Sequence, residues 1–315
     1  MKEKKMFTIT TNENLRLDIF LAHRMPEYSR SFFQRLIKDG KVLKNGKPCC
    51  SSHKVTQGDE LSVEYSADGI ILEPDTSIDL NIIHEDKDLI IVNKAPGMVV
   101  HPAAGNPTGT LANALAAHKG FINRNNKKDP LRPGIVHRLD KFTSGVMVVA
   151  KNDKAHYFLS RQFLNRKVKK IYLAIVHGTV QDAEAVIDVP LERDIHNRQK
   201  MAVHLAGRKA ETYIKLKSTH GLYSLVEIRP KTGRTHQIRV HMQYYGCPIA
   251  GDTIYGGKKV DAQLTGLLIP RQMLHAWKLT ITHPRSLKEV TYTVPVPSDF
   301  CSVWKRLSGG EQNDF

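Results

Sequence analysis

The sequence predicts an α+β fold, with a small domain near the N-terminus and a larger domain after it. The chain has 315 residues, which is enough for one large domain and one small one. Apolar stripes at helical spacing are interspersed with short runs whose side chains alternate as they do in strands. Hydrophobic residues make up 41% of the chain and charged residues 25%, so we expect a packed core with a polar surface.

The balance of charge indicates a polyanionic partner. Lys and Arg together number 47 and Asp and Glu 31, which gives a net charge of +16. The basic residues are interspersed along the chain, and this placement favours a nucleic acid over an anionic membrane. A basic protein without any such partner is the alternative.

Neither a targeting signal nor a metal motif is evident. No stretch approaches the roughly 20 apolar residues of a membrane span, and the charged N-terminus lacks an apolar signal core. The cysteines have neither zinc spacing nor an obvious pairing; they are Cys49, Cys50, Cys247 and Cys301. We therefore expect a cytoplasmic protein that binds no metal and no membrane.

Residues 13–75 predict a small domain of two helices and a hairpin. A short helix is expected from Leu15 to about His23, and Ser29 or Ser31 is expected to cap the second. The apolar face of the second helix consists of Phe32, Phe33, Leu36 and Ile37. Its basic residues, which fall largely elsewhere, are Arg30, Arg35 and Lys38. Asn-Gly at 45–46 predicts a hairpin turn, and residues 61–65 alternate as a strand.

This arrangement resembles the S4 RNA-binding domain. The similarity rests on Arg-Leu-Asp-x-Phe-Leu-Ala at 16–22, Ser-Arg-Ser at 29–31, Leu-Ile-Lys-x-Gly at 36–40 and Val-x-x-Gly-Asp at 55–59. The resemblance implies that Arg30, Arg35 and Lys38 grip structured RNA. A charged helix face that contacts only water is the alternative. Residues 66–78 have the composition of a linker.

A single carboxylate lies where a loop enters a predicted strand. Residues 146–150 are apolar and mostly β-branched, so they predict a buried strand. Asp140 precedes this run and has His137, Arg138 and Lys141 beside it. Neighbouring cations keep a carboxylate ionised, which suits a nucleophile or a base better than a general acid. The alternative is a structural Asp in a loop of ion pairs.

Three further blocks surround this stretch. Residues 93–102 follow a predicted strand at 89–92. Residues 166–178 begin with basic side chains and then alternate, so that Tyr172, Ala174 and Val176 share one face. The opposite face of that strand carries Ile171, Leu173 and Ile175. In residues 229–242, Gly233 allows a tight turn before a predicted helix.

Helices and loops are expected between these blocks. One helix is predicted over 111–117. Asp153 is expected to cap another helix, whose core stripe consists of Ala155, Phe158, Leu159 and Phe163. The basic segment 118–133 is expected to be a surface loop that RNA could order. The basic, turn-prone segment 191–209 is expected to lie on the RNA-facing rim.

The four blocks together resemble the RluA-type pseudouridine synthases. The strongest match is His-Arg-Leu-Asp at 137–140 followed by Thr-Ser-Gly at 143–145; the first block differs slightly, because Ala95 precedes Pro96. The resemblance implies a mixed, largely antiparallel central sheet flanked by helices and loops over residues 78–307, with a flexible tail at 308–315. It also implies that uridine in RNA is isomerised to pseudouridine, without metal or cofactor.

Roles for individual residues follow from the same resemblance. Asp140 would supply the covalent step, and Tyr172 would stack on the target base. Arg239 would pair with the carboxylate, and Ile238 would pack under it. The remaining expected RNA contacts of this domain are Arg138, Arg234, His236, Lys169 and Lys170. Whether Asp140 attacks C1' of the ribose or C6 of the uracil, or acts only as a base, stays open.

Within the family, an S4 domain joined to this catalytic type is most similar to enzymes that modify large-subunit ribosomal RNA. We therefore expect ribosomal RNA or a pre-ribosomal particle as partner, and a monomeric protein. Transfer RNA is the alternative substrate. A non-catalytic RNA-binding assembly factor and an RNA base hydrolase are the alternative functions; a lone Asp argues against the hydrolase, because glycoside hydrolysis typically uses two carboxylates.

Overall fold

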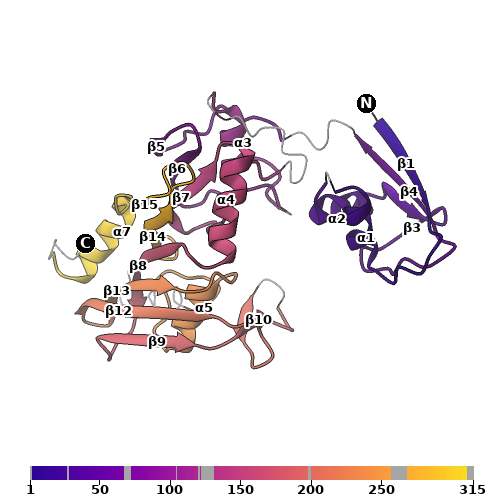
Figure 1. Cartoon of the computed structure of the whole chain (residues 1–315). Helices are drawn as coiled ribbons and strands as arrows, with labels where there is room; N and C mark the ends of the chain where they lie inside the picture. The colour runs from indigo at the N-terminus through magenta and orange to yellow at the C-terminus, as the bar shows by residue number, and fades with distance from the viewer. Residues whose placement is uncertain are drawn as a thin grey trace. The chain divides into compact units, whose positions relative to one another are not determined.

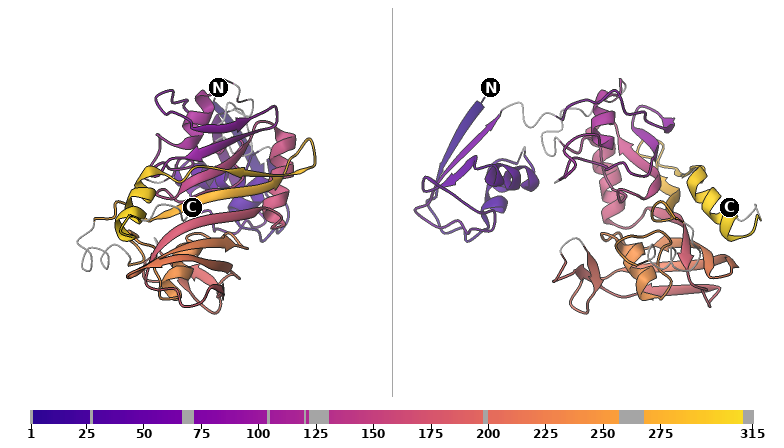
Figure 2. Two further views of the ribbon diagram at one scale, coloured as in Figure 1. Left: turned by 90° about the vertical axis from the view of Figure 1, so that its left-hand side faces the viewer. Right: turned by 180° about the vertical axis from the view of Figure 1, so that it is seen from behind.

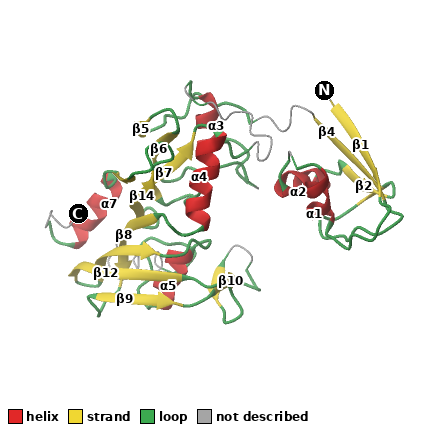
Figure 3. Ribbon diagram, viewed as in Figure 1, coloured by secondary structure: helices red, strands yellow, loops and turns green. Residues whose placement is uncertain are grey.

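The computed structural model consists of two compact units. It describes residues 2–26, 28–66, 72–103, 105–119, 121, 131–197, 200–256 and 268–310. One unit comprises Met1–Ile78 with His101–Gly134, and the other comprises Asp79–Val100 with Ile135–Phe315. Both strands and helices contribute to the fold, as Figure 3 shows, and the predicted α+β class is confirmed.

The first unit contains a four-stranded antiparallel sheet in the order β1-β4-β2-β3, with two helices. Its strands are β1 (Lys2–Thr8), β2 (Val42–Lys44), β3 (Lys47–Pro48) and β4 (Glu60–Ser66). Its two helices are α1 (Leu17–Arg24) and α2 (Arg30–Lys38). The turn between β2 and β3 is the predicted Asn45-Gly46, and both residues have the positive φ that such a turn requires.

The helix α2 forms as its sequence predicts. The side chain of Ser29 accepts a hydrogen bond from the backbone N–H of Phe32 and so caps the helix. The four predicted apolar side chains are buried in one cluster with residues of α1 and β4. Strand β1 was not predicted, because its charged alternation, Lys-Glu-Lys-Lys, lacks an apolar face at its start.

The helix α3 (Leu111–Ala117) is confirmed at the predicted residues. Thr110 and Asn113 form a reciprocal capping box at its start. The side-chain N–H of Asn113 also donates to the carbonyl of Glu73 at 2.8 Å, which ties α3 to the chain that precedes the second unit. Of the predicted loop 118–133, residues 120 and 122–130 lie outside the described part of the chain.

The second unit is built on one large sheet in the order β5-β6-β7-β14-β8-β13-β12-β9, with β15 paired to β14 (Figure 1). Its strands are β5 (Ile82–Glu85), β6 (Leu89–Lys94), β7 (Ser144–Ala150), β8 (Lys169–His177), β9 (Glu184–Asp188), β12 (Glu211–His220), β13 (Tyr223–Pro230), β14 (Leu274–Thr282) and β15 (Glu289–Thr293). Among these pairs β7–β14 is parallel and the others are antiparallel. The predicted mixed, largely antiparallel sheet is confirmed.

Helices cover both faces of this sheet (Figures 1 and 2). They are α4 (Asp153–Leu164), α5 (Gln237–Tyr244) and α7 (Ser298–Leu307). The predicted alternation along β8 is confirmed: Ala174 and Val176 pack in the cluster that includes α5, and Leu173 and Ile175 in the cluster that includes α7. A small ribbon of β10 (Leu191–Arg193) and β11 (Met201–Val203) lies in the predicted basic segment 191–209, of which residues 198–199 are not described.

Two predictions about α4 need correction. Asn152, and not Asp153, caps the helix, since its side chain accepts from the backbone N–H of Ala155 at 2.9 Å. Of the predicted core stripe, Phe158 and Phe163 are only half-buried, and Phe163 lies against the ring of His137, so neither is a core residue. Among the residues described, none of the helices is long and apolar enough to cross a membrane.

Candidate active site

A pocket of about 560 Å³ opens in the second unit, on the sheet face that carries α5. Its wall includes the loop before β7, the C-terminal end of α4, the start of β8 and the turn before α5. The predicted residues that line it are Arg138, Asp140, Lys170, Tyr172, Arg234, His236, Ile238 and Arg239. Segments separated by about a hundred residues of sequence thus meet at one cavity, whose size is typical of small-ligand sites.

Asp140 is held by a buried guanidinium. The Nη1 of Arg239 lies 3.0 Å from Oδ2 of Asp140, so the predicted ion pair is present. The side chain of Arg239 is 4% exposed and that of Asp140 is 22% exposed. The carboxylate therefore faces the cavity, while its partner is fixed in the protein interior.

A second carboxylate, Asp252, fixes Arg239 from behind. Its two oxygens accept from Nε and Nη2 of Arg239 at 2.6 and 2.9 Å in a bidentate pair. Backbone N–H groups of Ile254 and Tyr255 also donate to Asp252. Burial alone would lower the pKa of Arg239, but the hydrogen bonds to Asp252 and the charge of Asp140 outweigh burial and raise it.

The role of Asp252 was not recognised from the sequence. It stands in Gly-Asp-Thr-Ile-Tyr at 251–255, which follows the third block in the sequence. In the sequence, the Gly-Asp pair at 251–252 is the feature that could have indicated this site. In the structure, Gly251 has a positive φ and lies so close to the backbone of Arg271 that a side chain would not fit.

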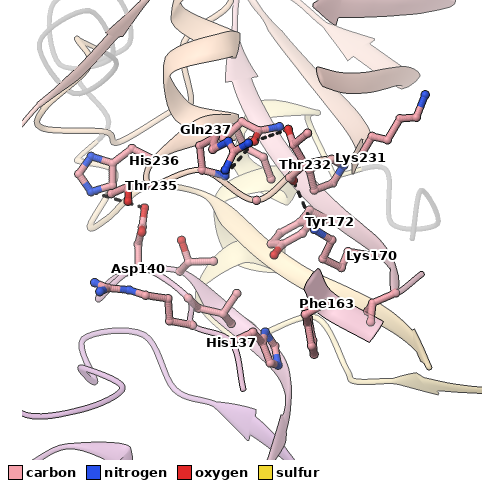
Figure 4. A pocket seen from close by; sticks show the side chains of 18 of the residues that line it. His137, Asp140, Phe163, Lys170, Tyr172, Lys231, Thr232, Thr235, His236 and Gln237 are labelled. Carbon is pink, nitrogen blue, oxygen red and sulfur yellow. Dashed lines mark hydrogen bonds and ion pairs between the residues drawn. The ribbon is translucent and has the colours of Figure 1, made fainter. Parts of the chain in front are cut away.

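Tyr172 and Lys170 project from β8 into the cavity. Figure 4 shows them next to one another, with Asp140 and His236 further along the wall. Burial and the nearby charge of Asp140 raise the pKa of Tyr172, so its phenol stays neutral. Lys170 donates to the carbonyl of Thr232 at 3.3 Å, and burial lowers its pKa to about 8.

Strand alternation separates Lys169 from Lys170. The Nζ of Lys169 pairs with Glu289 of β15 at 2.9 Å and is not among the residues that line the cavity. On the rim, Nε of Arg234 donates to the carbonyl of Lys209. In the first unit, Nε of Arg30 lies 2.8 Å from Asp18, whereas Lys38 is exposed.

His137 shapes the floor of the cavity without carrying charge. Its Nε2 accepts from the backbone N–H of Val148 at 3.0 Å, and its ring stacks on Phe163 with centroids 4.5 Å apart. Burial, assisted by the charge of Lys170, lowers the pKa of His137 to about 3. The neutral ring therefore joins the loop of Asp140 to strand β7.

Lys94 fixes the same loop from another side. Its Nζ donates to the carbonyls of Ala95, Met98 and Lys141 at 2.8, 3.0 and 3.1 Å. Burial lowers the pKa of Lys94 to about 7, yet three carbonyl partners require the three N–H donors of an ammonium. The side chain is 1% exposed, so Lys94 has a structural role in the protein interior.

Metal binding has no candidate in the described ranges. None of the His, Cys, Asp and Glu side chains there gather in groups of three or more that could hold an ion.

The pocket therefore combines an accessible carboxylate with an aromatic ring and several cations. This combination suits a covalent or base-assisted reaction on a flat base that belongs to a polyanionic substrate. The chain matches the RNA pseudouridylate synthase family over residues 88–244 and the S4 domain over residues 15–61.

Individual relatives cover nearly all of the chain. It is 42% identical to an uncharacterized RNA pseudouridine synthase, YlyB, of Bacillus subtilis, over 93% of this chain and 94% of that protein. It is also 42% identical to the ribosomal large subunit pseudouridine synthase D of Neisseria meningitidis serogroup B, over 90% of this chain and 76% of that protein. The solved structure of human RNA pseudouridylate synthase domain containing 1 matches with a TM-score of 0.56 and 27% identity, over 71% of this chain and 86% of that one.

The chain therefore belongs to the RNA pseudouridine synthase family. It is an enzyme of that class, and it carries an S4 RNA-binding domain.

Proposed function

We propose that this enzyme isomerises specific uridines in large-subunit ribosomal RNA, with Asp140 as the catalytic nucleophile. The proposal of a ribosomal substrate is supported by the relative from Neisseria meningitidis, whose name states that substrate. The S4 domain and the net charge of +16 favour a folded RNA as partner. Such a substrate would place the reaction in the cytoplasm.

The observation that carries the proposal is the Asp140–Arg239–Asp252 arrangement at the wall of the pocket. A nucleophile must be charged, accessible and aimed. Asp140 meets these needs, because it is partly exposed to the cavity while the buried pair of Arg239 and Asp252 fixes one of its oxygens.

The pocket accounts for the remaining demands of the reaction. The target base must leave its stack before a side chain can reach it, which costs a few kcal/mol. Tyr172 offers an aromatic ring for the extruded uracil, and Arg138, which is exposed and lines the cavity, would contact the RNA left behind. The reaction itself needs no energy source, because it breaks the C1'–N1 bond and makes a C1'–C5 bond within one molecule.

A direct test uses the purified protein and unmodified RNA. Large-subunit ribosomal RNA and total transfer RNA are transcribed without modifications, incubated with the protein in separate reactions, and mapped for pseudouridine. We expect pseudouridine at one or a few positions of the ribosomal RNA and no free uracil. Modification confined to transfer RNA would contradict the substrate, and release of uracil would contradict the isomerisation.

A further inference from the structure

His236 is a polar group at the pocket wall to which the proposed function gives no catalytic role. It immediately precedes α5 in the left-handed conformation, with φ of 54°. Its ring is 17% exposed, and its Nε2 lies 3.9 Å from Oδ2 of Asp140, as the dashed line in Figure 4 marks. That distance is too long for a hydrogen bond, so a substrate atom could approach Nε2 beside the carboxylate.

Tyr255 determines which nitrogen of His236 carries the proton. The phenol oxygen of Tyr255 accepts from the backbone N–H of Met201 at 3.0 Å and lies 2.8 Å from Nδ1 of His236. With Met201 already donating to the phenol oxygen, the phenol's own proton is available to donate to Nδ1 at this distance. An imidazole that accepts at Nδ1 carries its proton on Nε2. The N–H donor of His236 therefore points toward Asp140 and the cavity.

The surroundings keep this imidazole neutral. Burial lowers the pKa of His236; the charge of Asp140 opposes this shift and that of Arg239 adds to it. The guanidinium of Arg239 donates from Nε and Nη2 to Asp252 and from Nη1 to Asp140. The Nε2–H group of His236 is thus a neutral donor that lies next to the reacting carboxylate.

Both nucleophilic routes for Asp140, attack at C1' and attack at C6, develop negative charge on the uracil. When the C1'–N1 bond breaks, its electron pair stays with the base and is shared with the carbonyl oxygens O2 and O4. Addition of the carboxylate at C6 moves the C5–C6 electron pair toward O4. In either case a preorganised N–H donor that faces such an oxygen lowers the barrier, because the bond strengthens as the charge forms.

We propose that His236 is a catalytic residue whose Nε2–H donates to a carbonyl oxygen of the target uracil, and that Tyr255 is the positioning residue that holds it in this tautomer. The donor keeps its proton throughout. After the C1'–C5 bond forms, C5 loses its proton to water and N1 of the uracil takes up a proton, so that the reaction stays an isomerisation. This inference rests on the proposed function and adds a second reacting contact to it.

The test compares three variants in single-turnover reactions with enzyme in excess over its RNA. His236→Phe keeps the aromatic ring against Tyr255 but lacks the N–H, and His236→Gln restores an amide N–H near the position of Nε2. We expect His236→Phe to slow conversion by about 10²-fold or more while RNA affinity stays within about threefold. His236→Gln should recover most of the rate, and Tyr255→Phe should lose less than His236→Phe.

Other outcomes would overturn the inference. A His236→Phe variant that converts RNA at the wild-type rate removes the donor role. A His236→Gln variant as slow as His236→Phe, with thermal stability lowered in both, indicates that the ring is only structural. Wild-type protein and Asp140→Asn, run in parallel, separate the proposed function from the role of His236. An inactive wild type would overturn the proposed function and this inference with it. An active wild type with an equally active His236→Phe would overturn the inference alone.

Discussion

The pair of carboxylates that share Arg239 distinguishes this site from an ordinary ion pair. Asp252 is fully buried and binds the guanidinium through both oxygens, so Arg239 is fixed before any substrate arrives. Its remaining Nη1 then sets the position of Asp140. An arginine suits this task because a planar fork can bridge two carboxylates, whereas an ammonium is a single point of charge.

Arg239→Lys should therefore keep the charge and lose the reaction. We expect the single-turnover rate of pseudouridine formation to fall by about 10²-fold or more, since a small displacement of a reacting group costs that much. RNA affinity, measured by filter binding, should change little, because Arg239 is buried. Asp252→Asn is the matched control and should produce a partial loss of the same kind. A Lys variant with wild-type rate would show that the guanidinium does not aim Asp140.

The sequence predicted the residues of the site better than the bonds between them. Asp140, Tyr172 and Arg239 were assigned from matched blocks, and the fold brings all three to one pocket. The hydrogen bonds of Asp252 to Arg239 and the contact of His236 with Tyr255 could not be predicted, because both depend on burial and on segments that are distant in the sequence. The predicted alternation of this strand places Lys170 on the face of Tyr172 and Lys169 on the opposite face, although both were assigned as RNA contacts.

At the scale of elements, the loop of Asp140 leads directly into β7, which pairs in parallel with β14. Gly145 of β7 pairs with Ala276 of β14, and a Cβ on Gly145 would lie 2.2 Å from the carbonyl oxygen of Ala276. Gly145 also has φ of +121°, which side chains rarely adopt. The two strands can approach this closely only because position 145 lacks a side chain.

Gly145→Ala should push these strands apart and destabilise the second unit. We expect a loss of at least about 2 kcal/mol in the free energy of unfolding, measured by urea denaturation, and a parallel loss of activity. Gly97→Ala is the matched control: Gly97 also has positive φ, at +86°, but no atom lies within 4 Å of its added Cβ. The control should lose only about 1 kcal/mol. Equal losses would mean that the close approach to β14 is unimportant.

In the first unit, Asp18 joins α1 to α2. Its buried carboxylate accepts from Arg16, from Arg30 and from Gln34, the last at 2.6 Å. Burial opposes ionisation, but the hydrogen bonds from Arg16, Gln34 and Arg30 outweigh it and lower the pKa of Asp18 to about 2. Because the folded pKa lies below the unfolded one, this carboxylate stabilises the fold above about pH 4, and the contribution is lost as the pH falls toward 2.

Asp18→Asn should remove this pH dependence. At pH 7 we expect α1 and α2 to be less stable by about 2 kcal/mol than in the wild type, measured by amide hydrogen exchange of their peptides. The difference between the two proteins should shrink by pH 3 and vanish near pH 2. A difference that stays constant over this range would show that the ionised carboxylate is not what stabilises the helices.

Periodicity predicted elements well where one face alone is buried, and less well elsewhere. Helix α2 and strand β8 followed their patterns to within a residue or two. The β1 strand escaped detection because its pairing with β4 overrides a polar sequence. Family resemblance predicted a mixed, largely antiparallel sheet but not its strand order, since no local pattern specifies that β7 pairs with a strand that begins at Leu274.

For the whole molecule, RNA affinity and chemistry should be separable. The S4 match lies in the first unit, and the pocket lies entirely in the second. A deletion of residues 1–66 removes the S4 sheet and helices but leaves Glu73 and Asp75, which hydrogen-bond to Asn113. This truncated chain tests the two functions without disturbing α3.

We expect the deletion to weaken binding to folded RNA more than it slows conversion at saturating enzyme. The logarithm of affinity should also fall less steeply with salt, because each lost phosphate contact removes about 0.9 from the slope. Equal affinity and an equal salt slope for the full-length and truncated proteins would argue against RNA binding by the S4 domain.

The most direct test of the whole account is the rate of pseudouridine formation by Asp140→Asn, with RNA affinity measured on the same preparation. Asn keeps the shape of the side chain and removes its charge and nucleophilicity. We predict that conversion falls by at least about 10³-fold while affinity changes by no more than a few-fold. Turnover near that of the wild type would contradict the central role of the carboxylate that Arg239 and Asp252 hold in place.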